Sequence, residues 1–306
     1  MRAVIFGSTG NVSKPLATKL AKDGVETVVI TRSSNKADEI KAFGAIPAIG
    51  DIDDVEFLLK TFEGANCIFV NSPLPYTQPN IVEVINKQME YITEIILQSK
   101  VPNVVYLSSI GAHRPGIGGL EFHYYNEQIL KNKLSEVLNS LTFVRPAKFY
   151  SNLLVNLNDA KKGTVYSFLD IEKVHSYVSL DDIADIISEI IEHPPTNKLK
   201  VINIESERIT IPQIRDLFAK VFNQPELKWE YVPVENTVNA MVQLGLKRDS
   251  VDAIFESLAP PLHDEFHEDF FHGKTEIVKG NRTVEDYIKN ELKPIYDAIW
   301  YIKDTR

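Results

Sequence analysis

The sequence of 306 residues has only one cysteine, Cys67, which excludes an internal disulfide and fits a reducing compartment. Cys67 lies in the apolar run from Ala65 to Val70, where a buried, unreactive thiol is expected rather than a nucleophile. No apolar run approaches the roughly 18 residues of a membrane-spanning helix. Near the N-terminus, Gly7 to Asn11 interrupts any apolar stretch that a signal peptide would need. These absences predict a cytoplasmic protein.

Positive charge is scarce as well, because 33 lysines and arginines stand against 42 aspartates and glutamates and give a formal net charge of −9. The sequence also has no long basic run. Both features argue against nucleic acid or an anionic membrane as the main partner. A small molecule is therefore the expected partner, while a homodimer or a complex with a regulatory protein is left open.

What the sequence does have is a glycine turn between a strand pattern and a helix pattern. The run Arg2 to Phe6 is followed by Gly7 to Ser13, which reads G-x-x-G-x-x-S. Ser13 stands where the dinucleotide-binding fingerprint has a third glycine. Glycines let a backbone approach phosphates closely, and the N–H groups of a helix N-terminus favour an anion. The turn predicts a pyrophosphate site formed by Gly7, Thr9, Gly10, Asn11 and Val12.

The first half of the sequence alternates strand patterns with helix patterns. Strands are predicted at Val4 to Phe6, Thr27 to Ile30, Ala45 to Ile49, Cys67 to Val70, Val104 to Leu107 and Leu141 to Val144. The intervening segments include helices predicted over Lys36 to Phe43, Asp53 to Phe62 and Phe122 to Leu138. Repeated βα units predict an α/β fold with a doubly wound, Rossmann-type parallel sheet covered by helices on both faces.

After Arg145, strand and helix patterns no longer alternate regularly, and beyond about residue 206 the sequence is mostly helical in pattern. One clear helix begins at Ser179, which fits an N-cap with Asp182 three residues on. We expect an NAD(P)-binding domain over residues 1–150 and a smaller C-terminal substrate lobe over residues 151–306, partly interleaved with the first.

The end of the second predicted strand favours one dinucleotide over the other. Arg32 stands roughly 20 residues after the glycine turn, where an acid would bind the adenosine 2′-hydroxyl and an arginine accommodates a 2′-phosphate. The sequence therefore predicts NADP(H), with NAD(H) as the second choice. The alternative is a solvated arginine at a strand end.

Two further strand ends are expected to line the cofactor. After the third strand, Asp51 is placed to accept a hydrogen bond from the adenine amino group and Ile52 to cover the ring. An alternative, compatible role for this turn is that Asp53 caps the next helix. After the fourth strand, a proline-stiffened turn places Ser72, Pro73 and Leu74 near the second ribose, at the sheet edge where such folds bind ligands.

The fifth strand ends in Ser108 and Ser109, and to this point the chain resembles the short-chain dehydrogenase/reductase superfamily. The resemblance implies a serine here and a Tyr-x-x-x-Lys pair on the following helix. Ser108 is expected beside the cofactor. The pair is absent, because glutamine and isoleucine stand four residues after Tyr124 and Tyr125.

The helix carries His123 and Glu127 in the corresponding register. Residues four apart share a helix face, so both are expected to point into one cleft as the catalytic candidates. A glutamate would favour a protonated histidine and could accept hydrogen bonds from ribose hydroxyls. His123 would then donate a proton near neutral pH. The alternative is a buried pair that only fastens the helix.

With the segment Leu141 to Leu153, this H-x-x-x-E resembles the NmrA-like family of atypical short-chain dehydrogenase/reductases, particularly its quinone-oxidoreductase and dye-reductase branch. The same resemblance covers Gly7 to Ser13, the Gly50-Asp51 turn, residues 175–184 and residues 280–287, and so nearly the whole chain. Asn281-Arg282, where the family often has glycine-arginine, is a departure along with Ser13. The resemblance implies a Rossmann-type fold, NADP(H) as the cofactor, and Phe149 among its contacts.

Two functions follow from the resemblance. We favour an NADPH-dependent reductase, an oxidoreductase without the Tyr-x-x-x-Lys pair, that acts on a small planar electrophile such as a quinone or a dye. The rival is a non-catalytic NADP(H) sensor that regulates a partner protein. A sugar-nucleotide epimerase is a weaker alternative, because that reaction needs the missing base.

A histidine-rich segment, His263 to His272, has the i, i+4 spacing of two zinc ligands at His263 and His267. An aspartate replaces the glutamate of H-E-x-x-H, and three phenylalanines predict a helix with an aromatic inner face and a charged outer one. We therefore expect a solvated face here and no metal site.

Overall fold

The computed structural model describes residues 1–304 except 8, 72–77, 79 and 257–261. Its centre is an eight-stranded sheet in the order β13-β10-β6-β5-β4-β1-β2-β3, with every neighbouring pair parallel. The strands are β1 (Arg2–Phe6), β2 (Glu26–Thr31), β3 (Ile46–Ile49), β4 (Cys67–Val70), β5 (Asn103–Leu107), β6 (Ser140–Pro146), β10 (Leu199–Glu205) and β13 (Glu276–Lys279). The predicted Rossmann-type parallel sheet is confirmed.

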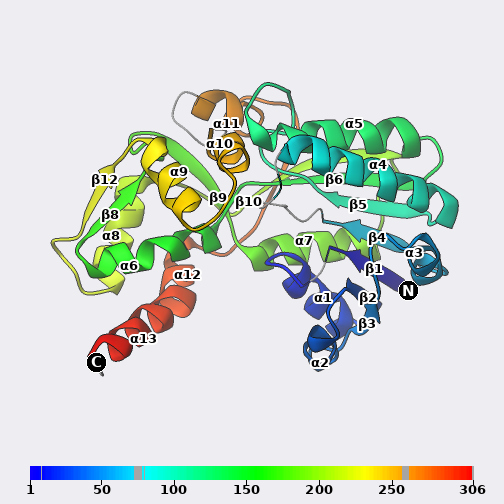
Figure 1. The fold of residues 1–306 in the computed structure, drawn as a ribbon, viewed down its shortest axis with the longest axis horizontal. Helices are drawn as coiled ribbons and strands as arrows, with labels where there is room; N and C mark the ends of the chain where they lie inside the picture. Colours follow the sequence, from blue (N-terminus) through cyan, green and yellow to red (C-terminus); the bar gives the residue numbers. More distant parts are fainter. Residues whose placement is uncertain (8, 72–77, 79, 257–261, 305–306) are drawn as a thin grey trace.

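Helices cover both faces of this sheet because alternate strand residues are apolar on both sides (Figure 1). In β1, Ala3 and Ile5 belong to one core cluster, whereas Val4 and Phe6 belong to the other. The first cluster is covered by α1 (Ser13–Lys22), α2 (Ala37–Ala42) and α7 (Leu180–Glu192). The second is covered by α3 (Val55–Phe62), α4 (Ile81–Ser99) and α5 (Phe122–Leu134).

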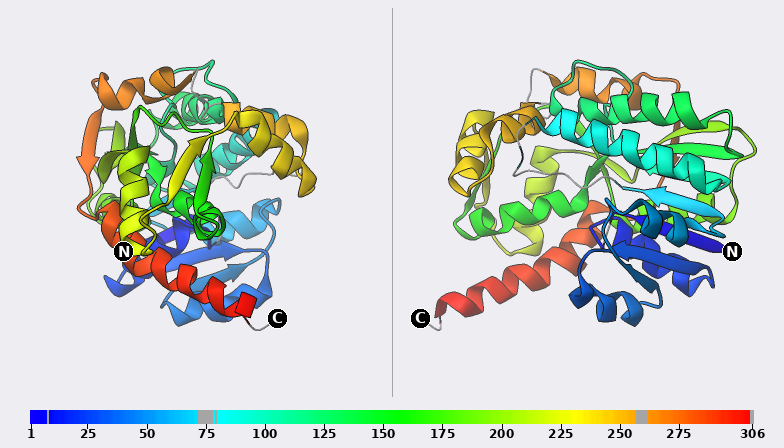
Figure 2. Two further views of the ribbon diagram at one scale, coloured as in Figure 1. Left: turned by 90° about the vertical axis from the view of Figure 1, so that its left-hand side faces the viewer. Right: turned by 45° about the vertical axis from the view of Figure 1, so that its right-hand side comes forward.

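The C-terminal half forms two small sheets and a third apolar cluster around Tyr150, Phe218 and Ile288. Their strands are β7 (Lys148–Phe149), β8 (Thr164–Ser167), β9 (Val174–Val178), β11 (Glu207–Thr210) and β12 (Lys228–Tyr231). The helices are α6 (Leu157–Lys161), α8 (Ile211–Val221), α9 (Val234–Gln243), α10 (Arg248–Glu256), α11 (His263–Phe271), α12 (Val284–Tyr287) and α13 (Lys293–Asp304). Figure 2 shows α13 running outward from the body to the C-terminus.

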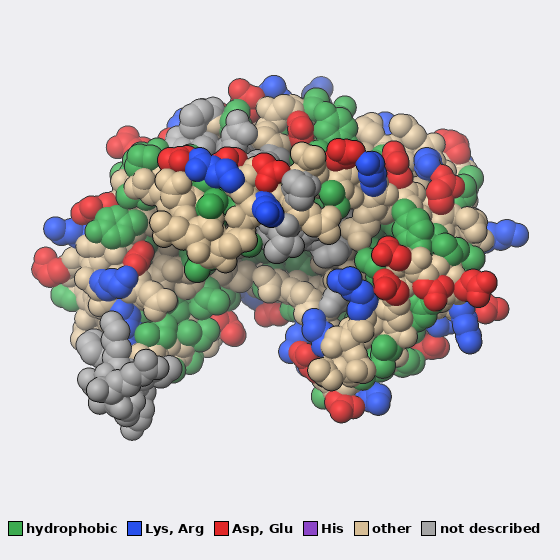
Figure 3. Space-filling view, in the orientation of Figure 1, with side chains coloured by type: hydrophobic (Ala, Val, Ile, Leu, Met, Phe, Trp, Pro, Cys, Tyr) green, Lys and Arg blue, Asp and Glu red, His purple; other side chains and the backbone are tan. Residues whose placement is uncertain are grey.

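Both halves of the chain build the main sheet, since β10 and β13 lie beyond β6 at its edge. The division at residue 150 stays a prediction. Figure 3 shows the molecule notched on its lower side, between the part that carries α1 and α2 and the part that carries α6 and α12. Among the helices that the structure describes, none is long and apolar enough to cross a membrane.

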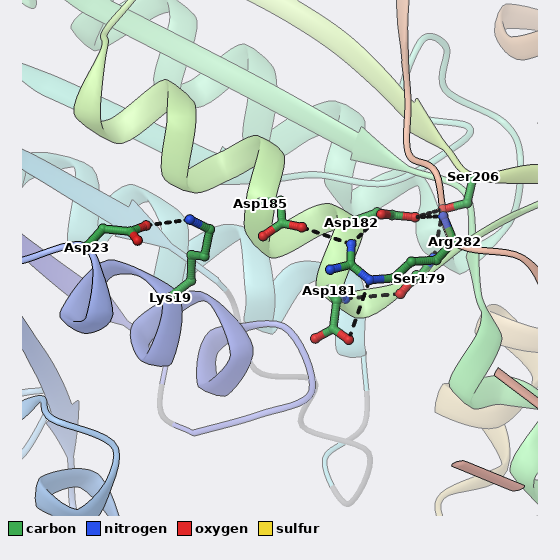
Figure 4. A network of polar contacts seen from close by, with 8 residues as sticks. All are labelled: Lys19, Asp23, Ser179, Asp181, Asp182, Asp185, Ser206 and Arg282. Carbon is green, nitrogen blue, oxygen red and sulfur yellow. Dashed lines mark hydrogen bonds and ion pairs between the residues drawn. The ribbon is translucent and has the colours of Figure 1, made fainter. Parts of the chain in front are cut away.

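A polar network fastens α7 to the C-terminal segment (Figure 4). Ser179 caps α7, as predicted, by accepting a hydrogen bond from the N–H of the residue two positions on. The carboxylate of Asp182 does not return to Ser179 as in a capping box; it accepts from Ser206 Oγ at 2.5 Å and from the Arg282 backbone N–H at 3.2 Å. A side chain at Gly280 would lie 2.2 Å from Asp182 Oδ2, so only glycine fits there.

Candidate functional site

The strand order reverses between β1 and β4, which is the point where open parallel sheets bind ligands. Gly7 follows β1 with φ of 126°, a conformation that L side chains rarely adopt. A Cβ on Gly7 would lie 2.1 Å from the carbonyl oxygen of Asn71, which follows β4. The Asn71 N–H donates to the Phe6 carbonyl at 2.9 Å. Gly7 is therefore required by the close packing of two strand ends.

The N-terminus of α1 lies beside the carboxyl ends of β1 and β4. The helix begins at Ser13 without a side-chain cap and has no acidic residue in its first turn. Around Gly10, no described atom lies within 4 Å of the position that a Cβ would take. The Lys14 N–H donates to the Gly10 carbonyl at 3.1 Å and Pro15 has no N–H, so the anion would be favoured by the N–H groups of Val12 and Ser13 together with the helix dipole. The residues present therefore fit a pyrophosphate in the space beside Gly10.

The other predicted residues of the turn have different environments. Asn11 is exposed and Thr9 half-buried, whereas Val12 is buried in the core beneath α1. Ser13 is also buried, and its Oγ accepts a hydrogen bond from Asn71 Nδ2 at 3.2 Å. A serine at the third glycine position thus ties the helix to the end of β4.

Arg32 follows β2, the neighbour of β1 in the sheet, and its side chain is exposed. Within the described residues, no group bonds to its guanidinium. The Gly50 N–H donates to the Thr31 carbonyl at 3.1 Å and holds the end of β3 beside the end of β2. An arginine at this edge and without a partner fits a 2′-phosphate.

The turn after β3 differs from its prediction in one detail. Asp51 is exposed and accepts from the Asp53 N–H at 3.2 Å, and Ile52 packs partly against the core. The helix cap is Asp54, which accepts from the N–H three residues on at 3.0 Å. The suggested cap at Asp53 is wrong, because Asp53 sits inside the turn that Asp51 closes.

Other predicted cofactor contacts are only partly visible. Ser72, Pro73 and Leu74 lie outside the described residues. Phe149 is half-buried at the end of β7. The roles of these four residues stay predictions.

Glu127 is held in a buried ion pair that the sequence did not reveal. Arg145 approaches both of its carboxylate oxygens, with Nε–Oε1 at 2.9 Å and Nη2–Oε2 at 2.6 Å. Ser108 Oγ donates to the same carboxylate at 2.5 Å. Burial raises the pKa of Glu127, while the contacts from Arg145 and Ser108 act to lower it. Arg145 also binds Asp269 on α11, so α5, β5, β6 and α11 meet at one charge cluster.

His123 belongs to a separate network. Its Nδ1 lies 2.9 Å from Tyr106 Oη, which also accepts from Asn126 Nδ2 at 3.0 Å. The Tyr106 hydroxyl can donate to His123 Nδ1 or accept from it, according to the tautomer of the ring. Burial lowers the pKa of His123 to about 3. The expected pairing of His123 with Glu127 is wrong, since Arg145 and Ser108 bind the Glu127 carboxylate, and partial burial favours the neutral form of the His123 ring. The catalytic role of the two residues stays a prediction.

The histidine-rich helix α11 also departs from its prediction. Phe266 and Phe270 face the core as expected, but His263 and His267 are buried beside them. Only His272, beyond the helix end, is exposed. The expected solvated face for this pair is wrong, because α11 packs against the small sheet at His175 of β9.

Comparisons with known proteins agree with this geometry. A profile of the NmrA-like family matches residues 2–288. The chain is 23% identical over 266 residues to the NAD(P)H azoreductase of Xenophilus azovorans, covering 84% of this chain and 87% of that one. A nucleoside-diphosphate-sugar epimerase from Staphylococcus aureus matches the fold with a TM-score of 0.75 at 14% identity, over 95% of this chain and 100% of that one. Triphenylmethane reductase from Citrobacter sp., solved with NADP(H), matches with a TM-score of 0.72 at 16% identity, over 94% and 99% of the two chains.

Proposed function

The chain belongs to the NmrA-like family, and from this premise we propose that it binds NADP(H) and reduces a small planar electrophile such as a quinone or a dye. The observation that carries the proposal is the uncapped N-terminus of α1 beside Gly10, at the switch point of the sheet. The relatives named for NAD(P)H azoreductase and triphenylmethane reductase activity support the substrate class.

The cofactor preference rests on charge. The pyrophosphate would accept hydrogen bonds from the N–H groups of Val12 and Ser13 at the start of α1, and the exposed Arg32 guanidinium would bind the 2′-phosphate. No acid takes the place of Arg32 to bind a free 2′-hydroxyl. The cofactor proposed is therefore NADP(H), with NAD(H) bound more weakly.

Reduction of a conjugated dye or quinone demands little from side chains, because bound NADPH supplies the hydride and the protein supplies positioning. The buried Ser108–Glu127–Arg145 contacts hold the carboxyl ends of β5 and β6 and the face of α5 in one arrangement. Burial lowers the pKa of His123 and favours its neutral form, so we expect the ring to position the nicotinamide end rather than to act as an acid. His123→Ala should then lower turnover and leave NADPH affinity unchanged.

One observation favours the second candidate, a non-catalytic NADP(H) sensor. Glu127 stands where the superfamily has its lysine, yet its carboxylate is already bound by Arg145 and Ser108. A carboxylate that is satisfied internally is suited to a structural role, which is compatible with binding without chemistry. Sugar-nucleotide epimerisation is not proposed, despite the fold likeness, because the Tyr-x-x-x-Lys pair is absent.

The deciding experiment measures NADPH oxidation with an azo dye, a triphenylmethane dye and a quinone, together with NADP⁺ and NADPH affinities by calorimetry. Turnover that disappears in a Gly10→Val variant supports the reductase. Tight NADPH binding without turnover on any of the three substrates supports the sensor. Absence of both binding and turnover would reject both.

A further inference from the structure

Three buried histidines converge at the junction of α11 and the small sheet. His175 lies on β9, and His263 and His267 lie one turn apart on α11. Their exposed fractions are 0%, 4% and 1%. One ring nitrogen of each lies within 4.8 Å of the corresponding nitrogens of the other two. Within the described part of the chain, three imidazoles this close together form a set of side chains that could bind a ligand between them.

The outward nitrogens of the rings fix which atoms face inward. His175 Nε2 donates to the Asp170 carbonyl at 2.7 Å, and His267 Nδ1 donates to the His263 carbonyl at 2.7 Å. His263 Nδ1 lies 3.1 Å from the Asp264 carboxylate. Because each of these acceptors requires an N–H, the remaining ring nitrogens carry lone pairs. Metal-binding histidines characteristically donate their second N–H to a carbonyl or a carboxylate in this way.

The inward nitrogens are only partly used by the protein itself. Lys148 Nζ lies 3.1 Å from His175 Nδ1 and 2.8 Å from His267 Nε2. His263 Nε2 is buried and has no hydrogen-bond partner among the described residues. The Lys148 amine therefore sits between two of the rings, and the third ring presents a lone pair without a partner among the described residues.

We propose that His175, His263 and His267 form a binding site for a divalent transition-metal ion of the Zn²⁺ class. Neutral imidazole ligands suit zinc and disfavour calcium and magnesium, which prefer oxygen. Tetrahedral zinc with Zn–N bonds of about 2.0–2.1 Å requires ring nitrogens roughly 3.4 Å apart, so the rings move inward by about an ångström or less. The ion takes the place of the Lys148 amine, and a water completes the shell.

Such a site would join α11 to β9. The same helix carries Asp269, which binds Arg145 and through it Glu127. Metal binding would therefore rigidify the helix that binds Arg145, without requiring the metal in the reaction.

The test uses the full chain freed of metal, titrated with Co²⁺ by visible absorption and with Zn²⁺ by calorimetry. We expect one ion per chain and the strong visible bands of tetrahedral Co²⁺. His263→Gln should weaken binding at least tenfold, whereas His272→Gln, at the exposed histidine beyond the same helix, should leave it unchanged. Lys148→Met keeps all three rings and removes the amine that competes for two of them, so it should bind at least tenfold more tightly than the unaltered chain.

The result that overturns the proposal is absence of stoichiometric binding in the unaltered chain, including the case in which only Lys148→Met binds. Equal affinity of His263→Gln and the unaltered chain would overturn it as well. The Lys148→Met comparison substitutes no histidine, so the site remains testable even where His263→Gln does not fold.

Discussion

The two glycines of the N-terminal turn are required for different reasons. Gly7 has a left-handed φ and no room for a Cβ against Asn71, whereas Gly10 faces open space. Gly10→Val should keep the fold and lower NADPH affinity at least tenfold, because its branched side chain would fill the space beside the helix N-terminus. Calorimetry measures the affinity and a thermal melt reports the fold. Gly7→Ala is the contrasting control and should lower the melting temperature. If folded Gly10→Val binds NADPH as tightly as the unaltered chain does, the turn is not part of the cofactor site.

Arg32 should discriminate between the two dinucleotides. A charge-assisted contact with a 2′-phosphate contributes about 1.5–3 kcal/mol, so Arg32→Ala should weaken NADPH by roughly ten- to a hundredfold and leave NADH nearly unchanged. Arg215→Ala removes an exposed arginine of α8 and controls for the loss of charge. Equal weakening of both dinucleotides would mean that Arg32 has a structural role.

Cys67 offers a test of the core. Burial raises the pKa of its thiol to about 12, so almost no thiolate forms at pH 8. The folded protein should therefore react with a disulfide reagent at least a hundredfold more slowly than the urea-unfolded chain, followed by absorbance. Comparable rates in the two states would show that the parallel sheet opens readily around β4.

Helix α5 illustrates how two residues one turn apart can serve separate networks. Glu127→Gln leaves the buried Arg145 guanidinium with Asp269 as its remaining carboxylate and should lower the free energy of unfolding by about 3 kcal/mol. His123→Phe keeps the ring packed near Phe122 and loses one hydrogen bond with Tyr106, at a cost of about 1 kcal/mol. Urea denaturation at pH 7 measures both. If the two variants lose the same stability, the assigned division between the networks is incorrect.

The elements that the sequence predicted well are those whose signal is local. Strands β1, β4 and β5 are short apolar runs with buried residues, and each was placed to within a residue or two. Strand β13 was not predicted, because its four residues are only half-buried and its place in the sheet depends on pairing with β10.

In the candidate site, too, features with a local sequence signal were predicted and contacts between distant residues were not. The glycine turn and Arg32 follow from position along the chain. The partners of Glu127 do not, since Arg145 lies 18 residues away in sequence and Asp269 lies 124 residues from Arg145. The buried histidines were assigned to a solvated face because helical spacing shows which residues share a face and not what packs against it. The NmrA-like resemblance is confirmed, because the order of several local motifs is more specific than any single contact.

At the scale of the molecule, the main sheet needs both halves of the chain. In the intact protein β6 is buried along its whole length and pairs with β10, and α1 packs against α7. Residues 1–150 expressed alone would expose the edge of β6 and the inner face of α1. We expect this fragment to aggregate or to lack a cooperative thermal transition, as judged by size-exclusion chromatography and circular dichroism. A monomeric, cooperatively melting fragment would instead support an independent N-terminal domain.

The contacts of Arg282 with α7 have a consequence for the order in which the molecule comes apart. Strand β13 is a short edge strand, and such strands fray first when nothing holds their ends. Its C-terminal end is anchored, since Arg282 binds Asp182 and Asp185 and Gly280 packs directly on Asp182. Because Asp182 lies in the first turn of a helix that packs on α1, opening this edge requires disturbing the interior. The end of β13 is therefore tied to the interior of the protein, and we expect this edge of the sheet to open only together with the core.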